Sequence, residues 1–304
     1  MKETNNLNLD NIFFLRGHPR SGTNWLGRVL NMHPDIKCHG EFHLEAFGNA
    51  KRKVESSVSC FILEERKPEL DKVYEVFIKS LIRQFNGNDH KFVGDRTPVA
   101  INTVIVPNSK YIVISRDGRD VIVSWFKHIL NIATKHKNNI SRYKAFNEAP
   151  KMTELALKLS EDPAYIRKNK RKLLASEKFF RNIARKWNDR VLNDHKAAAF
   201  MEKHFENINV MWVNYEELHA NIETKRSEIY SFLGADPAKA LELNDLTMPG
   251  YNNESGNRGK VGKWMDYFSE EKARWFDEEA SEALELLGYE NTVELFKTQS
   301  EVNN

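Results

Sequence analysis

The sequence predicts an α/β protein in which a parallel central sheet is covered by helices on both faces. Short apolar segments, which we interpret as buried strands, alternate with longer segments of helical periodicity. Strands that are apolar throughout and are separated by helices are typical of parallel sheets. Because ligands of such sheets bind beyond the carboxyl ends of the strands, the residues that follow each strand are the first candidates for a site.

The expected elements follow one of two patterns: a run of apolar residues for a strand, or apolar residues three and four apart for a helix. In chain order they are a strand at 12–15, a helix at 23–32, a helix at 71–85, a strand at 92–93, a strand at 111–115, a helix at 121–130, a strand at 209–213 and a helical segment at 215–233.

The length of 304 residues permits two domains, but one α/β domain of this size is equally ordinary. We expect a single domain over residues 1–304, in which residues 131–205 form a helical insertion or lid. Within it, residues 166–187 hold nine Lys or Arg and one acidic residue, which indicates an amphipathic helix with a solvated basic face. The alternative interpretation is that this stretch recognises an acidic ligand, such as a uronate sugar or a lipid head group. Residues 248–268, with four glycines and a proline, are expected to be irregular.

The composition excludes several classes of protein. The 46 basic and 43 acidic residues give a net charge of +3, so a bulk nucleic-acid binder is not expected. Two cysteines, Cys38 and Cys60, exclude a disulfide scaffold and a four-thiolate zinc site. The longest apolar run, residues 197–201, is far shorter than the ~20 residues of a membrane helix. Because the polar amino terminus also lacks a signal-peptide core, we expect a soluble, cytoplasmic protein. The oligomeric state does not follow from the sequence.

Residues 12–30 combine a strand, a tight loop and a helix. Gly17 and Gly22 relax the steric limits on the turn. Backbone N–H groups of residues 21–24 are expected to point to one spot at the start of the helix, which is a suitable place for an anion. A plain strand-to-helix turn with a Ser or Thr cap is the alternative, and the combination of glycines, hydroxyls and a cation favours a phosphate loop.

The loop departs from the loop of nucleoside triphosphatases, GxxxxGK followed by Ser or Thr. Gly17 and Gly22 have that spacing, but Thr23 stands where the lysine belongs, and the cation is Arg20 inside the loop. Ser21 and Thr23 add hydroxyl donors.

The segment HPRSGTNWL resembles the 5′-phosphosulfate loop, PKSGTTW, of sulfotransferases that use 3′-phosphoadenosine 5′-phosphosulfate (PAPS), with Arg20 in place of the lysine. A second segment, YIVISRDGRDVIVSWF, is similar to the part of the family that holds the 3′-phosphate. Arg116 and Ser124, eight residues apart, match the arginine and serine of that motif. A guanidinium and a hydroxyl are suited to grip one phosphate.

An alternative for the second segment is a set of surface ion pairs among Arg116, Asp117, Arg119 and Asp120. We adopt this alternative for Arg119 but not for Arg116.

A third segment, NRGKVGKWMDYF, resembles the family motif RKGxxGDWKNHF, a loop that closes over the 3′-phosphate. Arg258, Gly259 and Lys260 match it or supply its charge, whereas Asn257 replaces an Arg and Lys263 replaces an Asp. A flexible basic loop is the alternative.

The segment WVNYEEL is similar to YEDL, whose tyrosine lies beside the adenine in the family. Tyr215 is the match, and Trp25 is the candidate for the other face of the base. The alternative for both residues is an ordinary place in the core.

The resemblance runs from Ile12 to Phe268 and implies the P-loop-like sulfotransferase fold, PAPS as co-substrate, adenosine 3′,5′-bisphosphate (PAP) as product, and no metal ion. Arg20 is expected to serve the leaving phosphate oxygen. The residues expected to bind the nucleotide are Arg20, Ser21, Gly22, Thr23, Asn24, Trp25, Arg116, Ser124, Tyr215, Arg258, Gly259 and Lys260.

The catalytic base is predicted from a further resemblance. FVGDRTPVAI lacks the histidine of cytosolic sulfotransferases and resembles EKTPAY of heparan sulfate sulfotransferases, which carry a glutamate base in EVHFF after the second strand. The segment GEFHL has the same spacing, so Glu41 is the expected base, His43 a helper and Arg96 a ligand of the sulfuryl group or acceptor. His43 remains the competing base, because its ordinary pKa of ~6.5 suits neutral pH. We do not expect a metal site among His33, His39, Glu41 and His43, because these residues do not have the helical HExxH spacing of zinc ligands.

These features predict transfer of a sulfuryl group from PAPS to a hydroxyl, or alternatively an amine, of a small-molecule, carbohydrate or lipid acceptor. Two other functions stay open. A P-loop kinase using ATP would need the loop lysine that Thr23 replaces. A non-catalytic nucleotide-binding protein would need no base, and Glu41 argues against it.

Overall fold

The structure is a computed structural model of the chain. It describes residues 9–57, 67–135, 164–174, 176–245 and 261–302, together with residues 158, 161–162 and 247–248. Its helices and strands are, in chain order, β1 (Ile12–Gly17), α1 (Thr23–Leu30), β2 (Ile36–Gly40), α2 (Glu45–Ser57), α3 (Lys67–Asn86), β3 (Phe92–Arg96), η2 (Ile101–Thr103), β4 (Lys110–Ser115), α4 (Gly118–Lys135), α7 (Tyr165–Lys168), η4 (Lys170–Lys172), α8 (Glu177–His204), β5 (Asn209–Asn214), α9 (Tyr215–Ala220), α10 (Ile222–Leu233), η5 (Pro237–Lys239), η6 (Lys263–Asp266), α11 (Glu270–Leu286) and α12 (Thr292–Val302).

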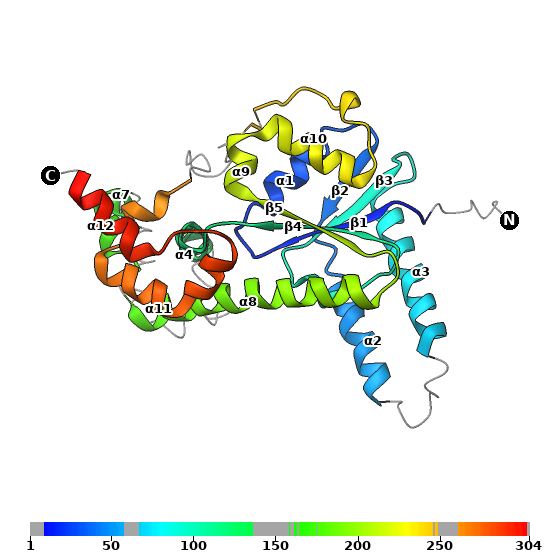
Figure 1. Cartoon of the computed structure of the whole chain (residues 1–304), viewed down its shortest axis with the longest axis horizontal. Helices are drawn as coiled ribbons and strands as arrows, with labels where there is room; N and C mark the ends of the chain where they lie inside the picture. Colours follow the sequence, from blue (N-terminus) through cyan, green and yellow to red (C-terminus); the bar gives the residue numbers. More distant parts are fainter. Residues whose placement is uncertain are drawn as a thin grey trace. The chain divides into compact units, whose positions relative to one another are not determined.

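Five parallel strands form the sheet, in the order β2-β3-β1-β4-β5 (Figure 1). After β1 the chain adds β2 and β3 on one side, and it then crosses over to add β4 and β5 on the other. The strand order therefore reverses at β1. In open parallel sheets this switch point is where ligands bind, and the loop after β1 lies there.

Helices cover both faces of the sheet, as predicted. Phe13 and Leu15 of β1 belong to a core cluster shared with α1, α9 and α10, whereas Ile12 and Phe14 belong to a cluster shared with α3 and the last turns of α8. Figure 1 shows α1, α9 and α10 on one side of the strands and α3 on the other. The strand therefore alternates between two apolar cores, which explains why residues 12–15 are all apolar.

The chain divides into two compact units. We name them the sheet unit, Met1–Ser115 with Asp194–Gly259, and the helical unit, Arg116–Asn193 with Lys260–Asn304. The helical unit has its own core, which is built from α4, α8, η6 and α11 and includes Phe126, Phe180, Trp187, Trp264 and Phe276. The single domain with residues 131–205 as an insertion or lid stays a prediction, and much of that stretch lies outside the described residues.

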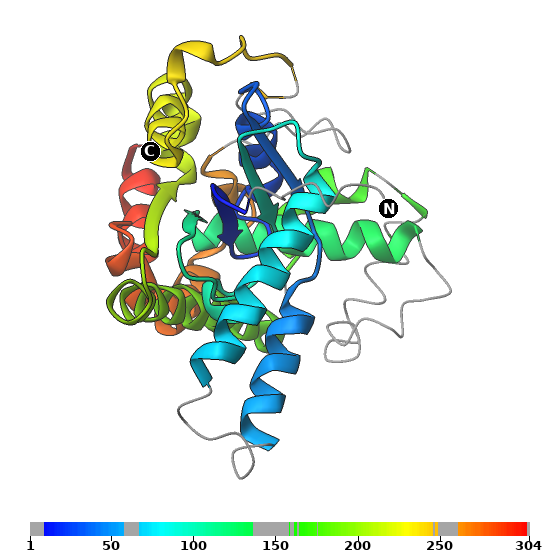
Figure 2. The ribbon, with the colours of Figure 1, turned by 90° about the vertical axis from the view of Figure 1, so that its right-hand side faces the viewer.

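In the sheet unit, α2 and α3 lie side by side (Figures 1 and 2). The rings of Phe47 and Phe77 meet edge to face with centroids 5.1 Å apart, and Lys51 Nζ lies 2.6 Å from a carboxylate oxygen of Asp71. None of the described helices is both long enough and apolar enough to span a bilayer.

Two local expectations differ from the structure. The segment expected as one helix at 215–233 is two helices, because the chain leaves helical geometry at Asn221. The first of them, α9, begins after Asn214, whose side chain accepts a hydrogen bond from the Glu217 N–H at 2.9 Å. Strand β2 did not appear among the elements expected from apolar runs. It is an edge strand in which buried Ile36 and Cys38 alternate with more exposed residues, so its apolar signal is weak.

The basic residues of the stretch at 166–187 do not all form a solvated face, because two of them pair with carboxylates within the fold. Its apolar residues Phe180, Ile183, Ala184 and Trp187 are buried in the helical unit, as expected. Two of its cations bind carboxylates of α11: Arg181 Nη1 lies 2.5 Å from Glu278 Oε2, and Arg185 Nε lies 2.7 Å from Glu279 Oε2. Part of the charge is therefore used within the fold.

A buried ion pair joins the carboxyl ends of β1 and β3. Arg16 Nη1 lies 2.8 Å from Asp95 Oδ2, and neither side chain is exposed. The Thr97 hydroxyl donates to Asp95 Oδ1 at 2.9 Å, and the guanidinium lies 4.8 Å from the ring centroid of Phe14. Removing one member of such a pair leaves the other charge buried without compensation, which is strongly destabilising.

We therefore expect Asp95→Ala to lower the free energy of unfolding by about 3–5 kcal/mol, measured by urea denaturation. The matched control is Asp89→Ala, since Asp89 is exposed in a turn before β3. An Asp95→Ala midpoint close to that of the control would show that the pair contributes little.

Candidate functional site

The loop between β1 and α1 turns sharply through left-handed backbone. Arg20 has φ of 76°, Gly22 has φ of 104°, and the Ser21 N–H donates to the His18 carbonyl at 3.0 Å. Gly22 is the N-cap residue of α1, and no side chain caps the helix. The first N–H groups of α1 therefore lack an internal acceptor, which is the condition for anion binding at a helix start.

Two glycines let this loop approach its neighbours closely. A Cβ on Gly17 would lie 2.6 Å from the Ile114 carbonyl oxygen of β4. A Cβ on Gly22 would lie 2.6 Å from Cδ2 of Tyr215. Both positions thus need glycine for space, and Gly22 needs it for its backbone angle as well.

Ser21 gives direct support for a bound group. Its side chain is 1% exposed, and its hydroxyl oxygen has no hydrogen-bond partner within the described part of the chain. A buried hydroxyl without a partner is costly, so native proteins usually satisfy it. A phosphate oxygen at the start of α1 would serve as that partner, beside Thr23 in the first turn. The residues present therefore fit a phosphate group.

Arg96, the last residue of β3, is held between two backbone segments. A Cβ on Gly27 of α1 would lie 2.6 Å from Arg96 Cδ, and one on Gly40 of β2 would lie 2.9 Å from Arg96 Cζ. Its Nη1 atom is buried and has no hydrogen-bond partner among the described residues. The guanidinium is therefore a positioned cation with donor capacity at the carboxyl ends of β2 and β3.

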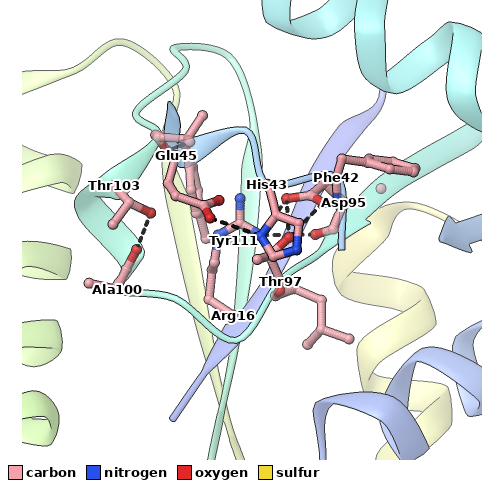
Figure 3. A network of polar contacts seen from close by, with 12 residues as sticks. Arg16, Phe42, His43, Glu45, Asp95, Thr97, Ala100, Thr103 and Tyr111 are labelled. Carbon is pink, nitrogen blue, oxygen red and sulfur yellow. Dashed lines mark hydrogen bonds and ion pairs between the residues drawn. The ribbon is translucent and has the colours of Figure 1, made fainter. Parts of the chain in front are cut away.

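Glu41 and His43 follow β2 directly, as the resemblance implies, and both are exposed. Figure 3 shows how this segment meets the buried ion pair. The Phe42 N–H donates a long hydrogen bond, 3.5 Å, to Asp95 Oδ1. The segment that carries the predicted base is thus attached to the carboxylate that binds Arg16.

His43 has a carboxylate partner that the sequence reasoning missed. Its Nδ1 atom lies 2.9 Å from Oε1 of Glu45, and this hydrogen bond raises the pKa of His43 above its ordinary value (Figure 3). A carboxylate on Nδ1 orients the ring and leaves Nε2 for proton exchange, the arrangement of base and orienting residue in hydrolytic triads. The presence of Glu45 two residues after His43 was the feature of the sequence from which this pair could have been predicted.

The aromatic pair expected beside adenine is in mutual contact. The rings of Trp25 and Tyr215 meet at 66° with centroids 5.2 Å apart, and Trp25 Nε1 donates to the Thr247 carbonyl at 2.8 Å. In this arrangement no third ring fits between them. The adenine role of each residue stays a prediction.

In the helical unit, Arg116 begins the segment expected to bind the 3′-phosphate. It is 8% exposed, and its Nη2 atom lies 3.3 Å from Oδ2 of Asp120. Arg119 pairs with Asp117 at 2.8 Å and lies over the Trp264 ring, 4.6 Å from the centroid. Both ion pairs exist, but they are buried rather than on the surface. Ser124 lies two turns into α4 and is half-buried.

Asp120 connects this segment with the third motif. Its carboxylate accepts hydrogen bonds from the N–H groups of Gly262 and Trp264, each at 2.9 Å, while it pairs with Arg116. Burial raises the pKa of Asp120, and the arginine and the two N–H donors act in the opposite direction. The turn that starts η6 is therefore fixed beside Arg116.

The remaining residues of the third motif, Arg258, Gly259 and Lys260, lie outside the described residues, and their roles stay predictions.

No group of three His, Cys, Asp or Glu suited to a metal ion occurs in the parts of the chain that the structure describes. Both ring nitrogens of His33 contact the backbone, at Asp35 N and the Asp236 carbonyl. The side chain of His39 is exposed, and partial burial lowers its pKa.

Comparison with known proteins agrees with the motifs. A family model described as "Sulfotransferase domain" matches residues 10–288. Human protein-tyrosine sulfotransferase 1 is 27% identical over 132 residues, a match that covers 40% of this chain and 35% of that protein. The zebrafish (Danio rerio) protein-tyrosine sulfotransferase 1 is 23% identical over 209 residues, covering 62% of this chain and 57% of that protein. The matches thus span only about a third to a half of these relatives' lengths.

Among solved structures, the mouse sulfotransferase SULT7A1 complexed with PAP is similar over 97% of this chain and 90% of its own, with 19% identity and a TM-score of 0.45. A sulfotransferase from Alicyclobacillus acidocaldarius covers 92% of this chain and 96% of its own, with 14% identity and a TM-score of 0.48.

From the close packing and left-handed backbone of Gly22 we predict the effect of replacing it by alanine. Gly22→Ala adds a Cβ that meets the Tyr215 ring and forces left-handed backbone on alanine, which alone costs ~1–2 kcal/mol. The control is Gly87→Ala, which has φ of 81° but no atom within 4 Å of the added Cβ. We expect Gly22→Ala to lower the urea midpoint more than the control and to weaken nucleotide binding, which the control leaves intact. Equal effects of the two variants would contradict the close packing of the loop.

Proposed function

The chain belongs to the sulfotransferase domain family, and on that premise we propose that it moves the sulfuryl group of PAPS to an acceptor hydroxyl. The observation that carries the proposal is the loop after β1. There, the N–H groups at the uncapped start of α1 and the buried Ser21 hydroxyl are both donors that an anion would satisfy. This loop lies at the switch point of the sheet.

The proposed roles divide between the two ends of the nucleotide. The loop residues would hold the 5′-phosphosulfate, with Arg20 on the oxygen that bridges phosphorus and sulfur. The 3′-phosphate would be held by Arg116, Ser124, Arg258, Gly259 and Lys260, and the adenine would lie beside Tyr215 or Trp25.

In the reaction, the acceptor oxygen forms a bond to sulfur while the bond between sulfur and the phosphate oxygen breaks. PAP leaves with the electron pair, and a base takes the acceptor proton. Arg96 is proposed to bind a sulfuryl oxygen, because its guanidinium is held in place and retains a donor. Glu41 is the proposed base, and the pair of His43 and Glu45 is the competitor.

Two observations bear on the acceptor. The likeness of GEFHL and GDRTP to heparan sulfate enzymes supports a carbohydrate hydroxyl. The matches to protein-tyrosine sulfotransferases support a second candidate, the phenol of a tyrosine in a protein. A small-molecule or lipid hydroxyl is the remaining class.

The test is transfer of isotopically labelled sulfate from PAPS to a panel of sugars, lipids, phenols and tyrosine peptides. We expect label in one acceptor class without added metal, and no phosphoryl transfer from ATP. Phosphoryl transfer from ATP with Mg²⁺ would show a kinase instead. Binding of PAPS with no transfer to any acceptor would favour a non-catalytic nucleotide-binding protein.

The base is tested by paired variants. We expect Glu41→Gln to bind PAP normally and to lose about a hundredfold in kcat, the usual contribution of a general base. His43→Ala should lose much less. Loss of transfer in His43→Ala with near-normal kcat in Glu41→Gln would assign the base to His43.

The pH profile of Glu45→Gln separates the two bases independently. A base must be unprotonated, and the hydrogen bond to Glu45 raises the pKa of His43, so with His43 as base the wild-type rate would rise at higher pH than with an unperturbed histidine. With His43 as base, Glu45→Gln would move this rise to lower pH. With Glu41 as base, we expect the profile to stay in place.

A further inference from the structure

In the helical unit, two lysines lie over the ring of Tyr267, and the charge of a third lysine acts on one of them. Lys127 of α4 lies with its Nζ atom 4.5 Å from the ring centroid of Tyr267, and Lys170 of η4 lies 5.9 Å from it. Lys263 begins η6, and its charge acts on Lys127. Lys170 also pairs with Asp266, Nζ to Oδ2, at 2.6 Å.

The gathering of like charges is unfavourable for the fold. Burial, followed by the charges of Lys263 and Lys170, lowers the pKa of Lys127 to about 8, while Asp120 and Asp266 act in the opposite direction. Among the described residues, these four charged groups act on Lys127, and the Tyr267 ring lies against it. Strongly perturbed groups of this kind are concentrated at functional sites, because a bound counter-ion compensates the repulsion.

Lys127 lies on the same side of α4 as a residue already predicted to bind phosphate. It follows Ser124 by three residues, a spacing that places two side chains on one helix face. Lys263 follows Gly262, whose N–H donates to Asp120, the partner of Arg116. Lys127 is therefore about one helical turn from Ser124, and Lys263 is the chain neighbour of a residue that Asp120 connects with Arg116.

We propose that Lys127 and Lys263 form part of the site that binds the 3′-phosphate of the nucleotide. This inference rests on the proposed function and deepens it, because it assigns two cations that the motifs of the family do not contain. In the third motif, Lys263 stands where the family has an Asp and Asn257 stands where it has an Arg. At these two positions the chain has lost a cation and has replaced an anion by a cation. A phosphate monoester dianion is the ligand that such a group of ammonium donors recognises.

The test compares the affinities of PAP and AMP, which differ by the 3′-phosphate, by calorimetry. We expect Lys127→Met to weaken PAP binding at least about tenfold, the effect of losing one charged hydrogen bond, and to leave AMP binding unchanged. Lys127→Arg, which retains the charge, should keep most of the preference for PAP. The matched control is Lys178→Met, an exposed lysine of α8 in the same unit with the same change of charge, and it should leave both affinities unchanged.

The pH dependence gives a second readout. A phosphate beside Lys127 favours its charged form, so binding of PAP takes up a proton once the free lysine is neutral. We therefore expect the preference of the wild type for PAP over AMP to fall as pH rises above about 8, and the preference of Lys127→Met to stay flat there.

Three outcomes would overturn the inference. If Arg116→Ala removes the preference for PAP while Lys127→Met and Lys263→Met retain it, the lysines lie outside the phosphate site and the proposed function stands. If the lysine variants instead raise only the KM of an anionic acceptor, the cluster serves the acceptor. If the wild type binds PAP and AMP equally, the proposed function fails together with the inference. Circular dichroism of each variant checks its fold, and Lys263→Met replaces Lys127→Met if the latter does not fold.

Discussion

The buried ion pair of Arg16 and Asp95 is the interaction on which the candidate site of the sheet unit depends. It joins β1, which leads into the loop before α1, to β3, which ends in Arg96. The same carboxylate accepts from Phe42 N–H, so it also holds the segment between Glu41 and His43 (Figure 3). A buried pair is a poor source of net stability, because desolvation offsets the attraction. Its effect here is to fix the relative positions of three segments that each carry a functional group.

The helical unit uses a similar arrangement. Asp120 pairs with Arg116 and accepts the N–H groups of Gly262 and Trp264, so one carboxylate fixes the start of α4 and the turn before η6. In both units a buried aspartate next to an arginine binds the backbone of a segment far away in the sequence. Each segment proposed to bind phosphate or accept a proton is therefore fixed in part by a buried carboxylate.

Much of the fold was predictable because its signals are local. Strands β1 and β4 are continuous apolar runs, and the glycine spacing after β1 marks the loop. Strand β2 was missed because an edge strand alternates. The roles of Asp95 and Asp120 were not predictable, since their partners Phe42 N and Gly262 N come from remote segments. For the same reason, ion pairs expected on the surface near Arg116 are buried: sequence spacing predicts that such charges pair, but not what packs over them.

Arg96 shows how the fold positions a cation at the carboxyl ends of β2 and β3. Its guanidinium lies close to the backbone of residues 27 and 40, where glycines leave space for it. Charge that develops on sulfuryl oxygens is best stabilised by donors that need no rearrangement, and a buried Nη1 without a partner among the described residues is suited to that role. Gly27 lies just after the segment HPRSGTNWL, and Gly40 is the first residue of GEFHL. Their contribution is steric, and the space that a side chain would fill is as much a part of the site as the charged groups are.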